Sequence, residues 1–331
     1  MDTERSAPMG TAARTKTTAM DGAGDSRLVV VQTRRGPVEC AIRGEGPTVL
    51  SLHGALGGWD QGLLLARTVG DPAFRYVAPS RPGYLGTALS LARTPAEQGA
   101  LYRDLLDALG IERAAVMAVS GGGPSALAFA LDHPDRCWGV VMVSSVCRRV
   151  EARLPLGWYV MRLMARCGPL VAAMRRRAER DPEEAARRSI PDPELRARTL
   201  RNPEVGPLLR ELQSSTLERM ALRLPGTEND VAVTRSELSF PLERLAAPLL
   251  VVHGTSDEAA PFEQAEEMAA RVPRAELLAL EGGRHVAIFT HREQARARVA
   301  RFLGAHAPGA RASDGDPNSL RSPGTRKSVV Q

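Results

Sequence analysis

The segment VMAVSGGGPSALAFALDHP, Val116–Pro134, joins an apolar run to a glycine-rich turn and a run of helix formers. The apolar residues predict a buried strand, and the residues after the glycines predict a helix that Pro134 ends. Ser120 stands at the turn, and the positions two before and two after it hold the small residues Ala118 and Gly122. This pattern is typical of a strand–turn–helix that exposes a nucleophilic serine. On this stretch alone, a glycine-rich turn with a solvated serine is the competing interpretation.

The composition limits the classes of protein that the chain can represent. Its 331 residues suffice for one large α/β domain with an insertion, or for two domains. The net charge is +6, but most of the excess arginine lies among many acidic residues between Arg148 and Arg223. Such a mixture is typical of solvated helix faces, so we expect no nucleic-acid partner.

Cysteine usage and hydropathy bear on location. The four cysteines show no CxxC pair and no histidine at metal spacing, so we expect reduced thiols, no metal, no cofactor and a cytoplasmic location. The N-terminus lacks the apolar centre of a signal peptide, and no apolar run is long enough to span a membrane. We therefore expect no stable membrane association, and a homodimer is left open.

The order of strand and helix patterns divides the chain into regions. Residues 27–150 and 235–304 alternate between the two, which predicts a mostly parallel, eight-stranded sheet with helices on both faces. Residues 151–234 show only helical patterns broken by proline and predict an inserted helical cap. Residues 1–26 and 305–331 lack periodicity and predict disordered tails. Ligands of such sheets bind beyond the carboxyl ends of the strands, so the loops there hold the candidate residues.

A serine nucleophile needs a base, and the base needs an acid to orient it. Of the late histidines, only His285 follows a predicted strand in a loop, and it is the candidate base. The acid is expected in the loop after the preceding buried strand, where Asp257 and Glu258 are both available. We favour Asp257 because Gly254 and Pro261 frame it as a strand-to-helix turn.

A tetrahedral intermediate also needs hydrogen-bond donors for its oxyanion. The candidates are the backbone N–H groups of Gly121 and Ala55, with Leu56 as the second choice for the latter. His53 is interpreted as a structural turn residue. Substrate contacts are expected from four side chains, although packing is the more frequent role of any one of them. These four are Leu56, Tyr84, Trp158 and Met161.

Five motifs occur together in one order: His-Gly-x-x-Gly, Arg-Pro-Gly-Tyr, Ser-x-Gly-Gly, Gly-x-x-Asp-x-x-x-Pro and Gly-Gly-x-His. In this combination the chain resembles the α/β-hydrolase superfamily over about residues 28–303. The resemblance implies the triad Ser120, Asp257 and His285, the oxyanion donors named above and a helical cap over the pocket. Two departures are Ser80, where an Asp is usual, and Leu85, where a Gly is common.

The residues and the resemblance predict a serine hydrolase that cleaves an ester or related acyl bond of a small apolar molecule through an acyl-enzyme. The same triad serves C–C bond hydrolases, lactonases and cofactor-free haloperoxidases, and some relatives are ligand-binding receptors with little turnover. Serine at the turn argues against haloalkane dehalogenases and epoxide hydrolases, which carry an aspartate there. A nucleotide-binding domain is disfavoured, because the turn lacks both G-x-G-x-x-G and a following lysine.

Overall fold

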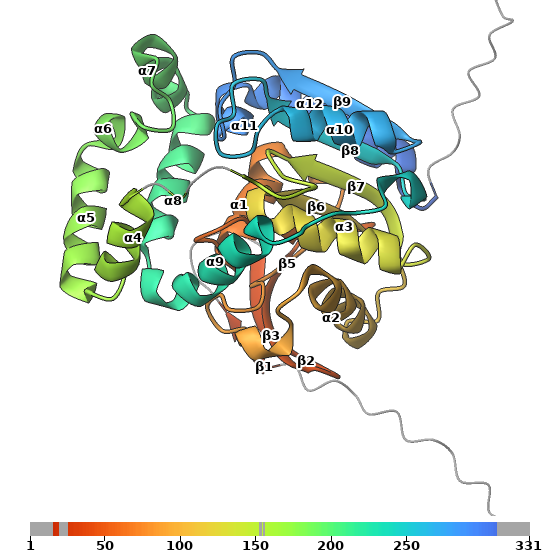
Figure 1. The fold of residues 1–331 in the computed structure, drawn as a ribbon. Coiled ribbons are helices and arrows are strands. Elements are labelled where there is room, and N and C mark those ends of the chain that lie inside the picture. Colours follow the sequence, from red (N-terminus) through yellow and green to blue (C-terminus); the bar gives the residue numbers. More distant parts are fainter. Residues whose placement is uncertain (1–15, 20–25, 152–153, 155, 310–331) are drawn as a thin grey trace, which may run out of the picture.

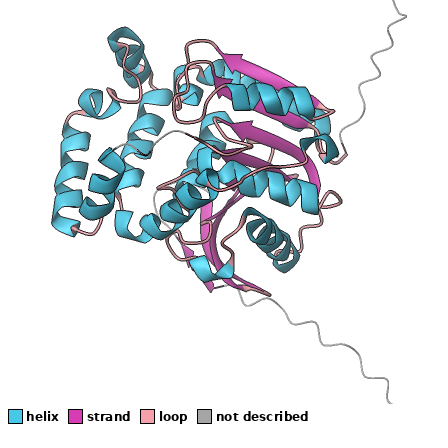
Figure 2. Cartoon of the chain, in the orientation of Figure 1, coloured by secondary structure: helices cyan, strands magenta, loops and turns pink. Residues whose placement is uncertain are grey.

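The computed structural model describes residues 16–19, 26–151, 154 and 156–309. These residues form a nine-stranded sheet flanked by helices (Figures 1 and 2). The pairs among β1, β2, β3 and β5 are antiparallel, and the remaining pairs are parallel. In sheet order the strands are β1 (Lys16–Ala19), β2 (Ser26–Thr33), β3 (Gly36–Arg43), β5 (Arg75–Pro79), β4 (Thr48–Leu52), β6 (Ala114–Val119), β7 (Cys137–Val143), β8 (Leu249–Gly254) and β9 (Ala275–Leu280).

The start of the chain differs from the prediction. Strands β2 to β9 are the eight predicted strands, and β1 adds a ninth at the edge of the sheet. Residues 1–26 were predicted as a disordered tail. Two parts of that prediction were wrong, because Lys16–Ala19 form a strand that pairs with β2 and Ser26 is the first residue of β2. The second predicted tail, 305–331, overlaps the last helix, which extends to His306. The other residues of both predicted tails lie outside the described residues, apart from 307–309.

Strand β6 shows why the apolar runs produce two buried faces. Successive side chains of a strand point to opposite faces. Val116 and Ala118 pack in one core cluster, whereas Ala115 and Met117 pack in another. The first cluster lies under α2 (Pro95–Ala108), α3 (Gly123–Asp132) and α10 (Glu263–Arg271), and the second under α1 (Trp59–Val69), α11 (Ala287–Thr290) and α12 (Arg292–His306) (Figure 1). A sheet covered on both faces favours near-continuous apolar runs in its central strands.

The region predicted as a cap consists of helices inserted between β7 and β8. Two of them are tied to the core by ion pairs, Arg67 of α1 with Glu211 at 2.6 Å and Asp60 of α1 with Arg223 at 2.6 Å. Figure 1 shows the other helices farther from the sheet. The inserted helices are α4 (Leu156–Met164), α5 (Gly168–Arg180), α6 (Pro182–Ala186), α7 (Pro193–Arg201), α8 (Val205–Leu217) and α9 (Met220–Arg235).

Helix α9 lies with its backbone directly on the loop that follows β5. The Gly226 N–H donates to Gly83 O at 2.9 Å, and the Leu85 N–H donates to Leu222 O at 2.9 Å. Pro225 lies inside α9 and has no N–H, so the helical ladder is already interrupted at this turn. A Cβ on Gly83 would lie 2.7 Å from the Gly226 Cα atom, so the close approach needs glycine. The helix is therefore held to the core by hydrogen bonds between backbones.

A buried charged cluster reinforces this contact. The Asp230 carboxylate of α9 accepts from both terminal nitrogens of Arg81, with Nη1 to Oδ1 at 3.0 Å. The Tyr84 hydroxyl donates to Asp230 Oδ2 at 2.5 Å. Arg81 and Tyr84 are 1% and 0% exposed. Removing one member of such a pair leaves an uncompensated buried charge, which is strongly destabilising.

His53 joins the loop after β4 to the loop after β5. The Arg81 backbone N–H donates to His53 Nε2 at 3.0 Å, and His53 Nδ1 lies 2.7 Å from Gly54 O. The imidazole is therefore neutral, with its proton on Nδ1. Complete burial, and then the Arg81 charge, lower the pKa of His53 well below 6.5. The interpretation of His53 as a structural turn residue agrees with these contacts.

We expect Gly226→Ala to destabilise the protein, because the added Cβ would lie 2.2 Å from the Tyr84 ring. Overpacking of this kind costs roughly 1–3 kcal/mol of the free energy of unfolding. The matched control is Gly304→Ala in α12, whose added Cβ meets nothing within 4 Å and which should be neutral or stabilising. Urea unfolding of both variants checks the expectation, and equal midpoints would contradict the close contact.

The contribution of His53 to stability should depend on pH. Its lowered pKa means that the unfolded chain takes up a proton below about pH 6.5 while the folded chain resists it. The stabilisation by the neutral imidazole is therefore complete above that pH and is lost as the pH falls. We expect the difference in melting temperature between wild type and His53→Ala to be largest near pH 8 and to shrink toward about pH 5. A difference that stays constant or widens in acid would show that the imidazole is not held neutral.

Candidate active site

The turn at Ser120 has the strand–turn–helix form predicted from its sequence. Ser120 follows β6, opens a short 3-10 turn and leads into α3. Its φ is +52°, in the left-handed region that non-glycine residues seldom adopt. A Cβ at Gly122 would lie 2.7 Å from His53 O, so only glycine allows the turn to pack this tightly. The backbone therefore presents the Ser120 side chain at the carboxyl end of the sheet.

Three predicted residues from three separate loops meet at this turn. His285 Nε2 lies 3.0 Å from Ser120 Oγ. On the other side of the ring, His285 Nδ1 lies 2.9 Å from Asp257 Oδ2 and 3.1 Å from Asp257 Oδ1. The three residues follow β6, β8 and β9, whose carboxyl ends share one edge of the parallel sheet. The arrangement allows the serine to pass its proton to the histidine while the aspartate holds the ring.

Asp257 is held as a carboxylate by its surroundings. Its Oδ1 atom accepts from the N–H groups of Ala259 at 2.9 Å and Ala260 at 3.0 Å. Burial raises the pKa of Asp257, but the hydrogen bond and charge of His285 outweigh burial, and the pKa lies below its ordinary value. An ionised Asp257 accepts the Nδ1 proton of His285 and leaves Nε2 free to accept from Ser120.

Glu258, the acid that the sequence left open beside Asp257, pairs with a different residue. Its side chain is 81% exposed and forms an ion pair with Arg284. Asp257, in contrast, has a side chain with 0% exposure and contacts His285 directly. The preference for Asp257 over Glu258 therefore agrees with the geometry.

His253 supports the Asp257 loop from beneath, a contact that the sequence did not predict. Its Nε2 atom lies 2.8 Å from Ala260 O and 3.5 Å from Asp257 Oδ2. Burial lowers the pKa of His253, so the ring is neutral and donates to the carbonyl. The sequence signal is its position, since His253 lies in β8 directly before Gly254 at the start of this loop.

The backbone around Ser120 offers the predicted oxyanion donors. Ala55 and Gly121 both line the cavity that contains Ser120. A Cβ on Gly121 would lie 3.6 Å from the Ala55 nitrogen, so the two residues are adjacent. Among the described residues, no group accepts a hydrogen bond from the Ala55 N–H. The N–H of Leu56, the second choice, already donates to Thr227 Oγ1 of α9 at 2.9 Å. The geometry therefore favours Ala55 and Gly121 as the donor pair.

The cavity beside Ser120 has a volume of about 800 Å³. Its wall includes apolar side chains from the segment before α4 and from the inserted helices. These are Val146, Val150, Leu154, Ala185 and Val231. Charged and polar side chains complete it: Arg188, Ser189, Asp230, Thr234, Arg235, Glu258 and Arg284. The space suits a small molecule with an apolar part and a polar end.

None of the four residues predicted to contact substrate lines this cavity. Leu56 and Met161 pack against a separate apolar cluster of inserted helices. Tyr84 is buried against Arg81 and Asp230. Trp158 lies part-buried on α4. For Trp158 and Met161 the sequence shows only the apolar pattern of a helix, and for Leu56 and Tyr84 only a place in a loop after a strand. Neither feature identifies the element that the side chain packs against.

Among the residues that the structure describes, no group of three or more histidine, cysteine, aspartate or glutamate side chains could hold a metal ion. In the same residues, no helix is both long enough and apolar enough to cross a membrane. The four cysteines are all free thiols.

Comparison with solved structures finds the same fold. An alpha/beta hydrolase fold protein from Nakamurella multipartita is 34% identical, with 83% of this chain and 98% of that chain covered and a TM-score of 0.73. A thermophilic esterase from Thermogutta terrifontis is 20% identical, with coverage of 85% and 99% and a TM-score of 0.61, a likeness that shows the fold alone.

Curated relatives and a family model agree with the structural comparison. A hydrolase of Paraburkholderia phymatum, named for 2-hydroxy-6-oxononadienedioate and 2-hydroxy-6-oxononatrienedioate, is 26% identical over 78% of this chain and 87% of its own length. An uncharacterised hydrolase of Bacillus subtilis is 31% identical over 37% of this chain, a match that spans only 43% of that protein. A family model described as the alpha/beta hydrolase fold matches residues 47–292. The chain therefore belongs to the α/β-hydrolase fold family.

Proposed function

We propose that this protein is a serine hydrolase that cleaves an ester or related acyl bond of a small, largely apolar molecule. The observation that carries the proposal is the chain of contacts from Ser120 Oγ through His285 to Asp257 at the wall of the cavity. A serine hydroxyl becomes a useful nucleophile when a base within hydrogen-bond reach takes its proton. At 3.0 Å, His285 Nε2 is within that reach.

In the proposed reaction Ser120 Oγ attacks the substrate carbonyl carbon while His285 Nε2 takes the hydroxyl proton. The tetrahedral oxyanion is stabilised by the N–H groups of Ala55 and Gly121. His285 then gives the proton to the leaving alcohol, and the acyl group stays on Ser120. Water, deprotonated by His285, attacks this acyl-enzyme, and His285 returns the proton to Ser120 Oγ as the acid leaves. Asp257 stabilises the imidazolium in both halves of the reaction.

Hydrolysis of a C–C bond is the second candidate. It is favoured by the Paraburkholderia phymatum relative, which is named as a hydrolase of 2-hydroxy-6-oxo dienedioates and is matched over most of its length. The same three side chains can serve either reaction, since fold and triad do not fix the substrate. A receptor with little turnover has less support, because its pocket would not need the complete Ser–His–Asp contact.

We expect Ser120→Ala to abolish covalent labelling by a fluorophosphonate probe that wild type accepts. The variant should remain folded, because alanine removes one atom and Ser120 Oγ contributes only its contact with His285. Gel fluorescence after labelling, together with the melting temperature, checks both points. Undiminished labelling of the variant would place the reactive nucleophile elsewhere.

Asp257→Asn and Glu258→Gln should differ greatly in rate. The first disfavours the tautomer of His285 that accepts from Ser120, and we expect kcat to fall on the order of a thousandfold or more. The second changes an exposed carboxylate paired with Arg284, and kcat should stay within about threefold. Steady-state kinetics on a series of p-nitrophenyl acyl esters measure both variants. A comparable loss in Glu258→Gln would reverse the assignment of the acid.

Adding a 2-hydroxy-6-oxo dienoate to this set of substrates separates the two candidate reactions. An esterase should turn over short acyl esters faster than a 2-hydroxy-6-oxo dienoate, and a C–C hydrolase should show the opposite preference in kcat/KM. Ser120→Ala should be inactive on the preferred substrate in either case, so this comparison tests the substrate class independently of the nucleophile.

A further inference from the structure

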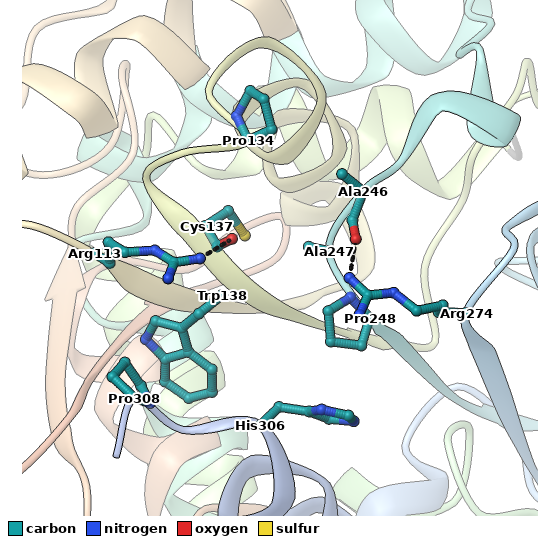
Figure 3. Close-up of a pocket in the computed structure, with 10 residues that line it drawn as sticks. All are labelled: Arg113, Pro134, Cys137, Trp138, Ala246, Ala247, Pro248, Arg274, His306 and Pro308. Atoms are coloured by element: carbon teal, nitrogen blue, oxygen red, sulfur yellow. Dashed lines mark hydrogen bonds between the residues drawn. The ribbon is translucent and has the colours of Figure 1, made fainter. Parts of the chain in front are cut away.

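Figure 3 shows a second pocket of the protein. It is formed where the parallel strands β6 to β9 begin, whereas the candidate active site lies where they end. Its volume is about 330 Å³. Its wall comes from the residues that precede or open these strands and from the end of α12. They are Arg113, Pro134, Cys137, Trp138, Ala246, Ala247, Pro248, Arg274, His306 and Pro308.

The pocket wall carries two guanidinium groups and no carboxylate. Arg113 Nη2 donates to Cys137 O at 3.4 Å, and Arg274 Nη2 donates to Ala246 O. Within the described ranges neither arginine forms an ion pair. Each guanidinium has five N–H donors, and each is anchored here through one nitrogen. The wall of this one pocket therefore holds two guanidinium groups, and most of their N–H donors have no hydrogen bond to the described part of the protein.

The indole of Trp138 adds an independent observation. Trp138 is 4% exposed, and its Nε1 atom is buried without a hydrogen-bond partner. The ring is fixed by stacking on Phe74, with centroids 6.1 Å apart. In Figure 3 the indole nitrogen lies on the Arg113 side of the ring. A buried donor without an acceptor is costly, so a group that supplies acceptor oxygens would be favoured here.

We propose that this pocket binds a small oxyanion, the phosphate or carboxylate group of a metabolite, between Arg113 and Arg274. A guanidinium matches both groups geometrically, because its parallel N–H bonds meet two oxygens at once. The volume holds a metabolite-sized ligand rather than a macromolecule. Binding here needs no hydrolytic activity, so the inference goes beyond the proposed function and stands independently of it.

A bound anion at this location is expected to stabilise the folded protein. The pocket joins the loops before β6, β8 and β9 to the end of α12. A ligand that bridges them stabilises the folded protein by mass action, and the gain rises with ligand concentration.

The indole N–H of Trp138 is the direct reporter. The full-length chain has three tryptophans, so a ¹⁵N–¹H spectrum shows three indole peaks, and Trp138→Phe identifies the relevant one. We expect inorganic phosphate, titrated against chloride at equal ionic strength, to shift this peak saturably and to raise the melting temperature. A parallel titration with succinate distinguishes a phosphate site from a carboxylate site by the lower Kd.

The variants Arg113→Gln, Arg274→Gln and their combination should weaken binding, the combination at least tenfold. The matched control is Arg176→Gln with Arg177→Gln, which removes two exposed arginines of α5 far from this pocket and should leave binding unchanged. The other two indole peaks report whether each variant is folded. The proposal is overturned if neither anion shifts the Trp138 peak saturably, or if the combined variant binds as wild type does.

Discussion

The left-handed backbone of Ser120 is the constraint on which the rest of the candidate site depends. A non-glycine residue held at φ +52° costs on the order of 1–3 kcal/mol, so the surrounding structure must over-determine it. Two features do so. Strand β6 is paired in parallel with β4 and β7 and is buried on both faces. The Ser145 hydroxyl, from the neighbouring strand end, donates to Ser120 O at 2.5 Å.

The loop that carries Ala55 is held in place beside Ser120 by contacts with helix α9. Thr227 accepts from the Leu56 N–H, and Asp230 lies so close to Gly121 that a Cβ there would be 2.8 Å from Oδ2. A lone carboxylate at that place would oppose an oxyanion forming on the neighbouring N–H groups. Pairing with Arg81 cancels this charge, which gives a reason for burying a complete guanidinium beside the site.

The sequence predicted the three side chains at the sheet edge because each follows a recognisable strand and is flanked by glycine or proline. Ser120, Asp257 and His285 could be assigned in this way, since parallel strands deliver their loops to one edge. Asp230 could not, because it is an ordinary acidic residue on a helix whose partner, Arg81, is 149 positions away in the chain. The side chains that line the cavity could not be identified either, because the segments that meet there are far apart in the chain. Strand β1 was missed because Lys16–Ala19 has no apolar alternation.

The wall of the cavity beside Ser120 has two parts, which are held to the core of the protein in different ways. Asp230, Val231 and Thr234 belong to α9, which backbone hydrogen bonds and a buried ion pair hold to the core. Ala185, Arg188 and Ser189 come from α6 and the turn after it, which no such bond joins to the core among the described residues. The α9 wall borders the reacting groups, where displacement by about 1 Å can cost a hundredfold in rate. The α6 segment is held by apolar burial instead, with Ala186 and Ile190 in the second core cluster. Because such burial is non-directional, we expect changes in substrate size to be accommodated there more easily than beside Gly121.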